Sequence, residues 1–164
     1  MKSNRPRIQI KLSTSDKILE TIGILLLICY GVGVALSYPL LPDTIPIHYN
    51  ASGEIDGYGA KESIFGLLIV GILLYIGLSV LTKYPHHFNY PIDITPQNAE
   101  KQYTAAIRMV RILKVSIVII FALIECQTVL SAIGHENTFG KFFMPLVILL
   151  MFGPLIYYMI KSSK

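Results

Sequence analysis

The chain has 164 residues, of which 53% are hydrophobic and only 15% are charged. Soluble domains carry about 25% charged residues, so this composition indicates a protein that lies in lipid. Together with only two cysteines, it excludes a soluble enzyme, a disordered protein and a disulfide-stabilised scaffold.

Four stretches of the chain carry little or no charge, and each is long enough to cross a membrane. They are residues 21–42, 63–82, 115–134 and 142–160, and Glu125 is the one charged residue within them. A bilayer core of about 30 Å needs roughly 20 apolar residues of helix, so each stretch crosses once. We therefore predict an all-α integral membrane protein: a four-transmembrane-helix bundle with an ordered outer loop and a cytoplasmic amphipathic helix leading into span three.

The basic residues predict the orientation of these spans. Twelve of the 14 Lys and Arg residues lie before span one, between spans two and three, or after span four. By the positive-inside rule, both termini and the second loop are cytoplasmic. The formal net charge of +4 is thus interpreted as a topology signal, and no nucleic-acid partner is predicted.

The spans divide the chain into three parts. We expect a basic cytoplasmic tail over residues 1–17 and a three-span domain over 18–134, with an outer loop at 39–63 and a cytoplasmic loop and helix at 83–114. Residues 135–164 then supply a short outer loop, the fourth span and the cytoplasmic C-terminus.

An amphipathic helix is predicted to begin at Thr95 and Pro96, because Thr caps helices and Pro fits their first position. After it, apolar residues recur every three to four positions, while basic residues such as Arg108 and Arg111 take other faces. We expect these basic side chains to lie near phospholipid headgroups at the cytoplasmic interface.

The outer loop holds the densest group of polar side chains. Its prolines restrict φ and its Asn and Gly residues favour turns, so we expect an ordered cap on the outer ends of the spans. The candidate binding residues are Pro42, Asp43, Pro46, His48, Tyr49, Asn50, Gly53, Asp56 and Gly57. The spacing of the oxygen donors does not fit a calcium loop, so no metal is predicted. No phosphate loop or dinucleotide fingerprint occurs in the sequence, so no cofactor is predicted.

A longer pattern in this loop resembles a known family. Residues 41–58 read Leu-Pro-x-x-Ile-Pro-x-His-Tyr-Asn-x-x-Gly-x-x-Asp-Gly-Tyr directly after a first span, and the second loop around residues 88–103 is also similar. This pattern resembles the bacterial and archaeal membrane family called domain of unknown function 1648. The resemblance implies a multi-pass protein of a prokaryotic plasma membrane, related to SdpI-type immunity proteins. Those proteins protect a producing cell from a membrane-active peptide toxin and hold a repressor at the membrane.

Glu125 lies near the middle of the third span. A carboxylate at that depth costs about 2.5–3.5 kcal/mol and usually faces the bundle interior, so we expect a neutral side chain that is hydrogen-bonded to another helix. A proton or cation relay is the alternative interpretation.

Three functions remain open at this point. The first is a non-enzymatic protein that recognises a peptide toxin or another membrane protein, in an immunity or signalling role. The second is a small transporter or transporter subunit that uses Glu125. The third is a membrane enzyme whose site is the outer loop.

Overall fold

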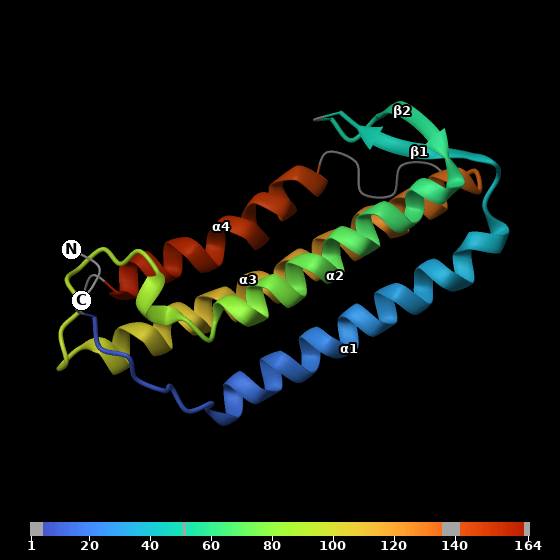
Figure 1. The fold of residues 1–164 in the computed structure, drawn as a ribbon. Helices are drawn as coiled ribbons and strands as arrows, with labels where there is room; N and C mark the ends of the chain where they lie inside the picture. Colours follow the sequence, from blue (N-terminus) through green and yellow to red (C-terminus); the bar gives the residue numbers. More distant parts are fainter. Residues whose placement is uncertain (1–4, 51, 136–141, 163–164) are drawn as a thin grey trace.

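The computed structural model describes residues 5–50, 52–135 and 142–162. Within them the chain forms four α-helices and a β-hairpin (Figure 1). The elements are α1 (Thr14–Ser37), β1 (Thr44–Tyr49), β2 (Ile55–Ala60), α2 (Ile64–Leu81), α3 (Ala99–Ala132) and α4 (Phe143–Ser162). Short 3-10 helices η1 (Tyr38–Leu40), η2 (Lys61–Ser63) and η3 (Pro85–His87) connect them.

The four helices lie side by side, and α3 is the element that packs against each of the other three (Figure 1). The β-hairpin covers one end of the bundle, which we call the hairpin end. The opposite end, called the basic end, holds residues 5–13, η3 and the first turns of α3 (Figure 1). The interior of the fold is therefore organised around α3.

Among the described residues, three segments are long and apolar enough to cross a membrane: Thr14–Leu40, Lys61–Leu81 and Phe143–Ile160. They coincide with the expected first, second and fourth spans and extend the first one toward the N-terminus, whereas the expected third span, residues 115–134, is not among them. The third expected span forms the second half of α3. That half buries the polar residues Glu125, Gln127 and Thr128, because the neighbouring helices shield it on several sides.

The ends of α1 and α3 follow from local chemistry. Ser13 caps α1: its hydroxyl accepts from the Asp16 N–H at 3.2 Å, and the Asp16 carboxylate accepts from the Ser13 N–H at 3.0 Å. The start predicted for the amphipathic helix at Thr95 is wrong by a turn. Asn98 Oδ1 accepts from the Thr95 N–H at 2.9 Å, which holds these residues in a turn, and α3 begins at Ala99.

The expected all-α architecture needs a correction in the outer loop, because β1 and β2 pair as an antiparallel hairpin. β1 reads Thr-Ile-Pro-Ile-His-Tyr, and β-branched and aromatic residues favour strands. Irregular pairing follows Pro46, whose nitrogen has no hydrogen to donate. The hairpin lies where the proline and turn residues predicted an ordered cap.

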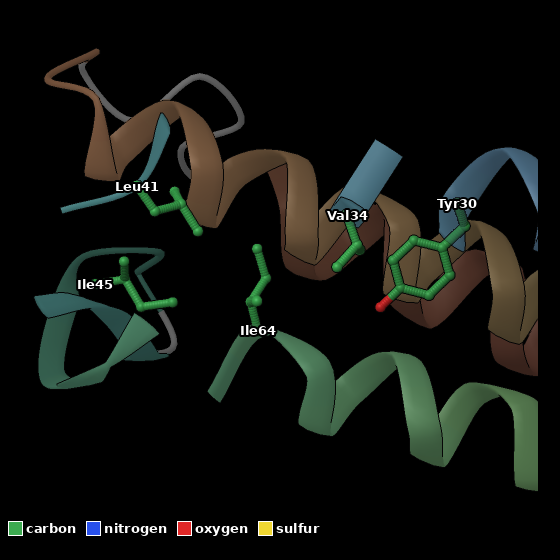
Figure 2. Packing of buried hydrophobic residues seen from close by; sticks show 5 residues of the cluster. All are labelled: Tyr30, Val34, Leu41, Ile45 and Ile64. Carbon is green, nitrogen blue, oxygen red and sulfur yellow. The ribbon is translucent and has the colours of Figure 1, made fainter. Parts of the chain in front are cut away.

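An apolar cluster fixes the hairpin to the bundle. Ile45 of β1 is 1% exposed, and Leu41, which precedes β1, is also buried. They pack with Tyr30 and Val34 of α1 and with Ile64 at the start of α2 (Figure 2). Burial of apolar surface contributes about 25 cal/mol per Å², so this cluster holds the cap in place.

The basic side chains of α3 have partners within the fold that the sequence did not predict. Arg108, Arg111 and Lys114 form ion pairs with Asp16 and Glu20 of α1. Taking a cation out of water is costly unless a carboxylate compensates it. The two acidic residues at the start of α1 supply part of that compensation.

Candidate functional site

A cavity of about 480 Å³ lies beneath the hairpin. Its walls come from β1, the first turns of α2 and α4, and the second half of α3. Most of the lining is apolar, including Ile45, Leu67, Ile124 and Phe143, and Glu125 adds a carboxyl group. Ligand sites in proteins commonly combine an apolar surface with a few polar groups in this way.

Glu125 forms part of the cavity wall and is only 5% exposed. The hydroxyl of Tyr30 on α1 donates a hydrogen bond of 3.0 Å to Glu125 Oε2. Glu125 also lines a second cavity of about 360 Å³ between α1 and α3, which Tyr30 and Cys29 border. One carboxyl group therefore reaches two cavities.

The hairpin contacts α3 through a polar pair beside Glu125. The Tyr49 hydroxyl lies 3.3 Å from Thr128 Oγ1, and both residues line the cavity under the hairpin. Thr128 is three residues after Glu125 and so shares its helix face. This pair brings the end of β1 to the same region of α3 as the buried carboxyl group.

His48 and Asp56 meet across the two strands, where His48 Nδ1 contacts Asp56 Oδ1. Their side chains are 70% and 43% exposed. Gly57 lies opposite His48 and permits this approach, because a Cβ on Gly57 would stand 3.0 Å from the His48 Cβ. The pair can orient the imidazole ring, and His48 also lines the cavity.

Asn50 and Gly53 form the turn of the hairpin. Asn50 Oδ1 accepts from the N–H groups of Ser52 at 2.9 Å and Glu54 at 3.0 Å, an Asx-type arrangement. Gly53 has a φ of 81°, in the region that favours glycine. These two residues shape the loop rather than line the cavity.

The structure thus brings together only some of the residues expected at the site. Pro46, His48 and Tyr49 share the cavity wall with Glu125. Pro42 and Asp43 are exposed and lie outside that wall, and Asp43 pairs with Lys61 at 3.0 Å. Within the ranges that the structure describes, no three His, Cys, Asp or Glu side chains are grouped to hold a metal ion.

Sequence reasoning missed Tyr30 and Phe143 as site residues. Tyr30 is the hydrogen-bond donor to Glu125, and Phe143 closes the cavity from α4. A usable signal existed for Tyr30, because a hydroxyl near the middle of one apolar span is a suitable partner for a carboxyl group in another. Phe143 carried no such signal, since apolar residues surround it in the sequence.

Comparison with known proteins gives a family for part of this chain. Residues 24–72 match the family described as "Domain of unknown function (DUF1648)", which confirms the resemblance seen in the outer loop. An uncharacterized protein of Archaeoglobus fulgidus is 32% identical over 81 residues, covering 44% of this chain and 43% of the relative. The chain thus spans less than half of that relative. No solved structure matches.

Proposed function

We propose that this chain, whose residues 24–72 belong to the DUF1648 family, is a non-enzymatic membrane protein that binds a peptide or an apolar segment of another membrane protein. The binding site is the cavity under the hairpin. The observation that carries the proposal is a mostly apolar cavity of about 480 Å³ with one buried carboxyl group in its wall.

The lining of the cavity defines the chemistry of the ligand. Its size lies within the range of roughly 300–1,000 Å³ that is usual for ligand sites, so it admits a few side chains. Apolar groups of the ligand pack on Ile45, Leu67 and Phe143. An amine or amide of the ligand bonds to Glu125, with the hydroxyl groups of Tyr49 and Thr128 beside it. An amphipathic peptide carries both kinds of group.

The proposed topology places this cavity toward the outside of a prokaryotic cell. In it, α3 is a fourth crossing, and the basic end with both termini faces the cytoplasm, as the distribution of Lys and Arg favours. The hairpin then meets molecules that arrive from outside. Together with the resemblance to immunity proteins, this orientation supports protection against a peptide toxin as the biological role.

A second candidate function is transport. The position of Glu125 in the walls of two cavities favours it, because a carboxyl group between two cavities can pass a proton or cation from one to the other. In the described residues of α1, α2 and α4 that lie deep in the spans, no second charged side chain extends such a path. Peptide binding is therefore the function we favour.

Fluorescence of a single tryptophan tests the proposal. The chain has no Trp, so Phe143→Trp places a reporter in the cavity wall with little change in shape. The probe is a synthetic amphipathic helical peptide of Leu and Lys, added to the protein in nanodiscs. We expect saturable binding that Glu125→Gln weakens about tenfold, as loss of a hydrogen bond to a charged group does.

Two controls decide the outcome. Glu62→Gln makes the same substitution at the hairpin end, outside the cavity wall, and should leave the affinity unchanged. Empty nanodiscs measure the binding of the peptide to lipid alone. Equal affinity of the parent and the Glu125→Gln protein contradicts the proposal. Proton uptake into proteoliposomes that disappears in Glu125→Gln indicates the transporter instead.

A further inference from the structure

A network of charged side chains joins α1 to α3 at the basic end. Lys114 Nζ donates to Glu20 Oε2 at 2.6 Å and to Ser79 Oγ of α2 at 2.8 Å. Arg111 pairs with Glu20 at 3.0 Å and with Asp16 at 3.4 Å. The side chains of Lys114 and Arg111 are 1% and 9% exposed, so the network is largely shielded from water.

The charges in this network do not balance. Arg108 also pairs with Asp16, at 3.1 Å, so three cationic side chains share the carboxylates of Asp16 and Glu20. The Arg108 side chain is 39% exposed, so the excess positive charge lies at the edge of the network, where it favours a nearby anion. The network therefore attracts an anion to its surface.

A cavity of about 480 Å³ opens beside the network, and it offers a place for that anion. Arg111 and Glu20 form part of its wall, together with Lys83 at the end of α2. Lys83 makes no ion pair with any residue that the structure describes. Lys83 and Arg111 thus give the cavity wall two positive charges. The one carboxylate in the wall, Glu20, already pairs with Arg111 and Lys114.

The N-terminal segment, residues 5–13, supplies most of the apolar lining, while Gln9, Ser79 and Thr82 add polar groups. Ile8, Ile10 and Leu12 line the cavity on that side, and Ile107 of α3 lines it from within the bundle. Two contacts hold this segment across the basic end. The Tyr103 hydroxyl, whose pKa is raised by burial, donates to the Pro6 carbonyl at 3.1 Å. Arg5 donates to the Phe88 carbonyl at 2.5 Å.

We propose that this cavity binds an anionic phospholipid, with the headgroup phosphate on Lys83 and Arg111 and the upper acyl chains against Ile8, Ile10 and Leu12. The combination of cations and apolar side chains fits a lipid better than a free anion, because inorganic phosphate gains nothing from the apolar wall. The place also fits, since Lys83 lies two residues after the end of the apolar segment Lys61–Leu81, where a headgroup is expected.

Native mass spectrometry of the purified full-length protein tests this site. The protein is extracted in mild detergent and titrated separately with phosphatidylglycerol and with phosphatidylcholine, and the fraction that retains one lipid is measured. We expect preferential retention of phosphatidylglycerol. Lys83→Gln should weaken that retention about fivefold, the effect of one cation near an anionic headgroup, and Lys83→Glu should weaken it further.

Lys17→Gln is the matched control, because it removes the same charge from the same end of the bundle but does not line the cavity. It should retain phosphatidylglycerol as the parent protein does. Equal loss in Lys17→Gln and Lys83→Gln, or equal retention of the two lipids by the parent, overturns the proposal. Displacement of the lipid by millimolar inorganic phosphate also overturns it, because a free anion would then be the ligand.

Discussion

The Tyr30 hydroxyl donates a hydrogen bond of 3.0 Å to Glu125 Oε2, and this contact links the second half of α1 to the second half of α3. The two residues are 95 positions apart in the chain. A buried carboxyl group without a partner costs free energy, so the bond both positions Glu125 and offsets part of the cost of placing it there.

Replacement of Tyr30 by Phe should lower the free energy of unfolding by about 1–3 kcal/mol, because Glu125 then loses a hydrogen-bond partner while it stays buried. Unfolding by SDS in mixed micelles measures the change. Tyr58→Phe is the control, since Tyr58 is 63% exposed on the hairpin. Equal effects of the two substitutions would show that the bond to Glu125 contributes nothing.

Gly23 of α1 permits close packing against α2, because a Cβ at this position would stand 2.7 Å from the Tyr75 hydroxyl oxygen. Gly23→Ala should therefore destabilise the fold by about 1–3 kcal/mol, the usual cost of an overpacked site. Gly33→Ala in the same helix meets nothing within 4 Å and should be neutral or stabilising. A comparison of SDS unfolding midpoints tests this, and a neutral Gly23→Ala would refute the close approach.

Lys114→Met should destabilise the fold strongly, by about 3 kcal/mol, since it removes a buried cation that bonds Glu20 and Ser79. Combining it with Glu20→Gln should recover part of the loss, because the carboxylate that lost its partner is then also removed. Lys17→Met, at an exposed position of α1, is the control for loss of a charge. Additive losses in the double variant would contradict the coupling.

Asn50→Ala should loosen the hairpin, because the Asn50 side chain accepts from two backbone N–H groups of the turn. Limited proteolysis of the detergent-solubilised protein should show slow cutting of residues 43–59 in the parent and faster cutting in the variant. Ser52→Ala serves as the control in the same loop. An outer loop in the parent that is cut as fast as the N-terminal tail would show that the hairpin is not a stable cap.

Cysteine labelling on intact cells tests the topology, including α3 as a fourth crossing. In a background with Cys29→Ala and Cys126→Ala, a membrane-impermeant maleimide should label Ser52→Cys and His135→Cys. Asn89→Cys should react only after lysis, because it lies between α2 and α3 in the second loop. Labelling of Asn89→Cys and His135→Cys from the same side would show that α3 does not cross.

The sequence by itself identified segments 21–42, 63–82 and 142–160 as apolar enough to cross a membrane, because that property depends only on local runs of uncharged residues. It also identified the outer loop as rich in turn residues and as part of the DUF1648 pattern, since prolines and turn residues act over a few positions. The strands within that loop were missed, because pairing depends on which backbone groups of β1 and β2 meet.

Only the tertiary structure decided which distant side chains share a site. The sequence showed Glu125 and the basic residues of α3 but not their partners, Tyr30 for the former and Asp16 and Glu20 for the latter. The local pattern could not identify these partners, because the residues on one helix face indicate that the face is buried but not which element covers it. The rotation and depth of α1 against α3 settled it, bringing each polar group to a partner that offsets the cost of its removal from water.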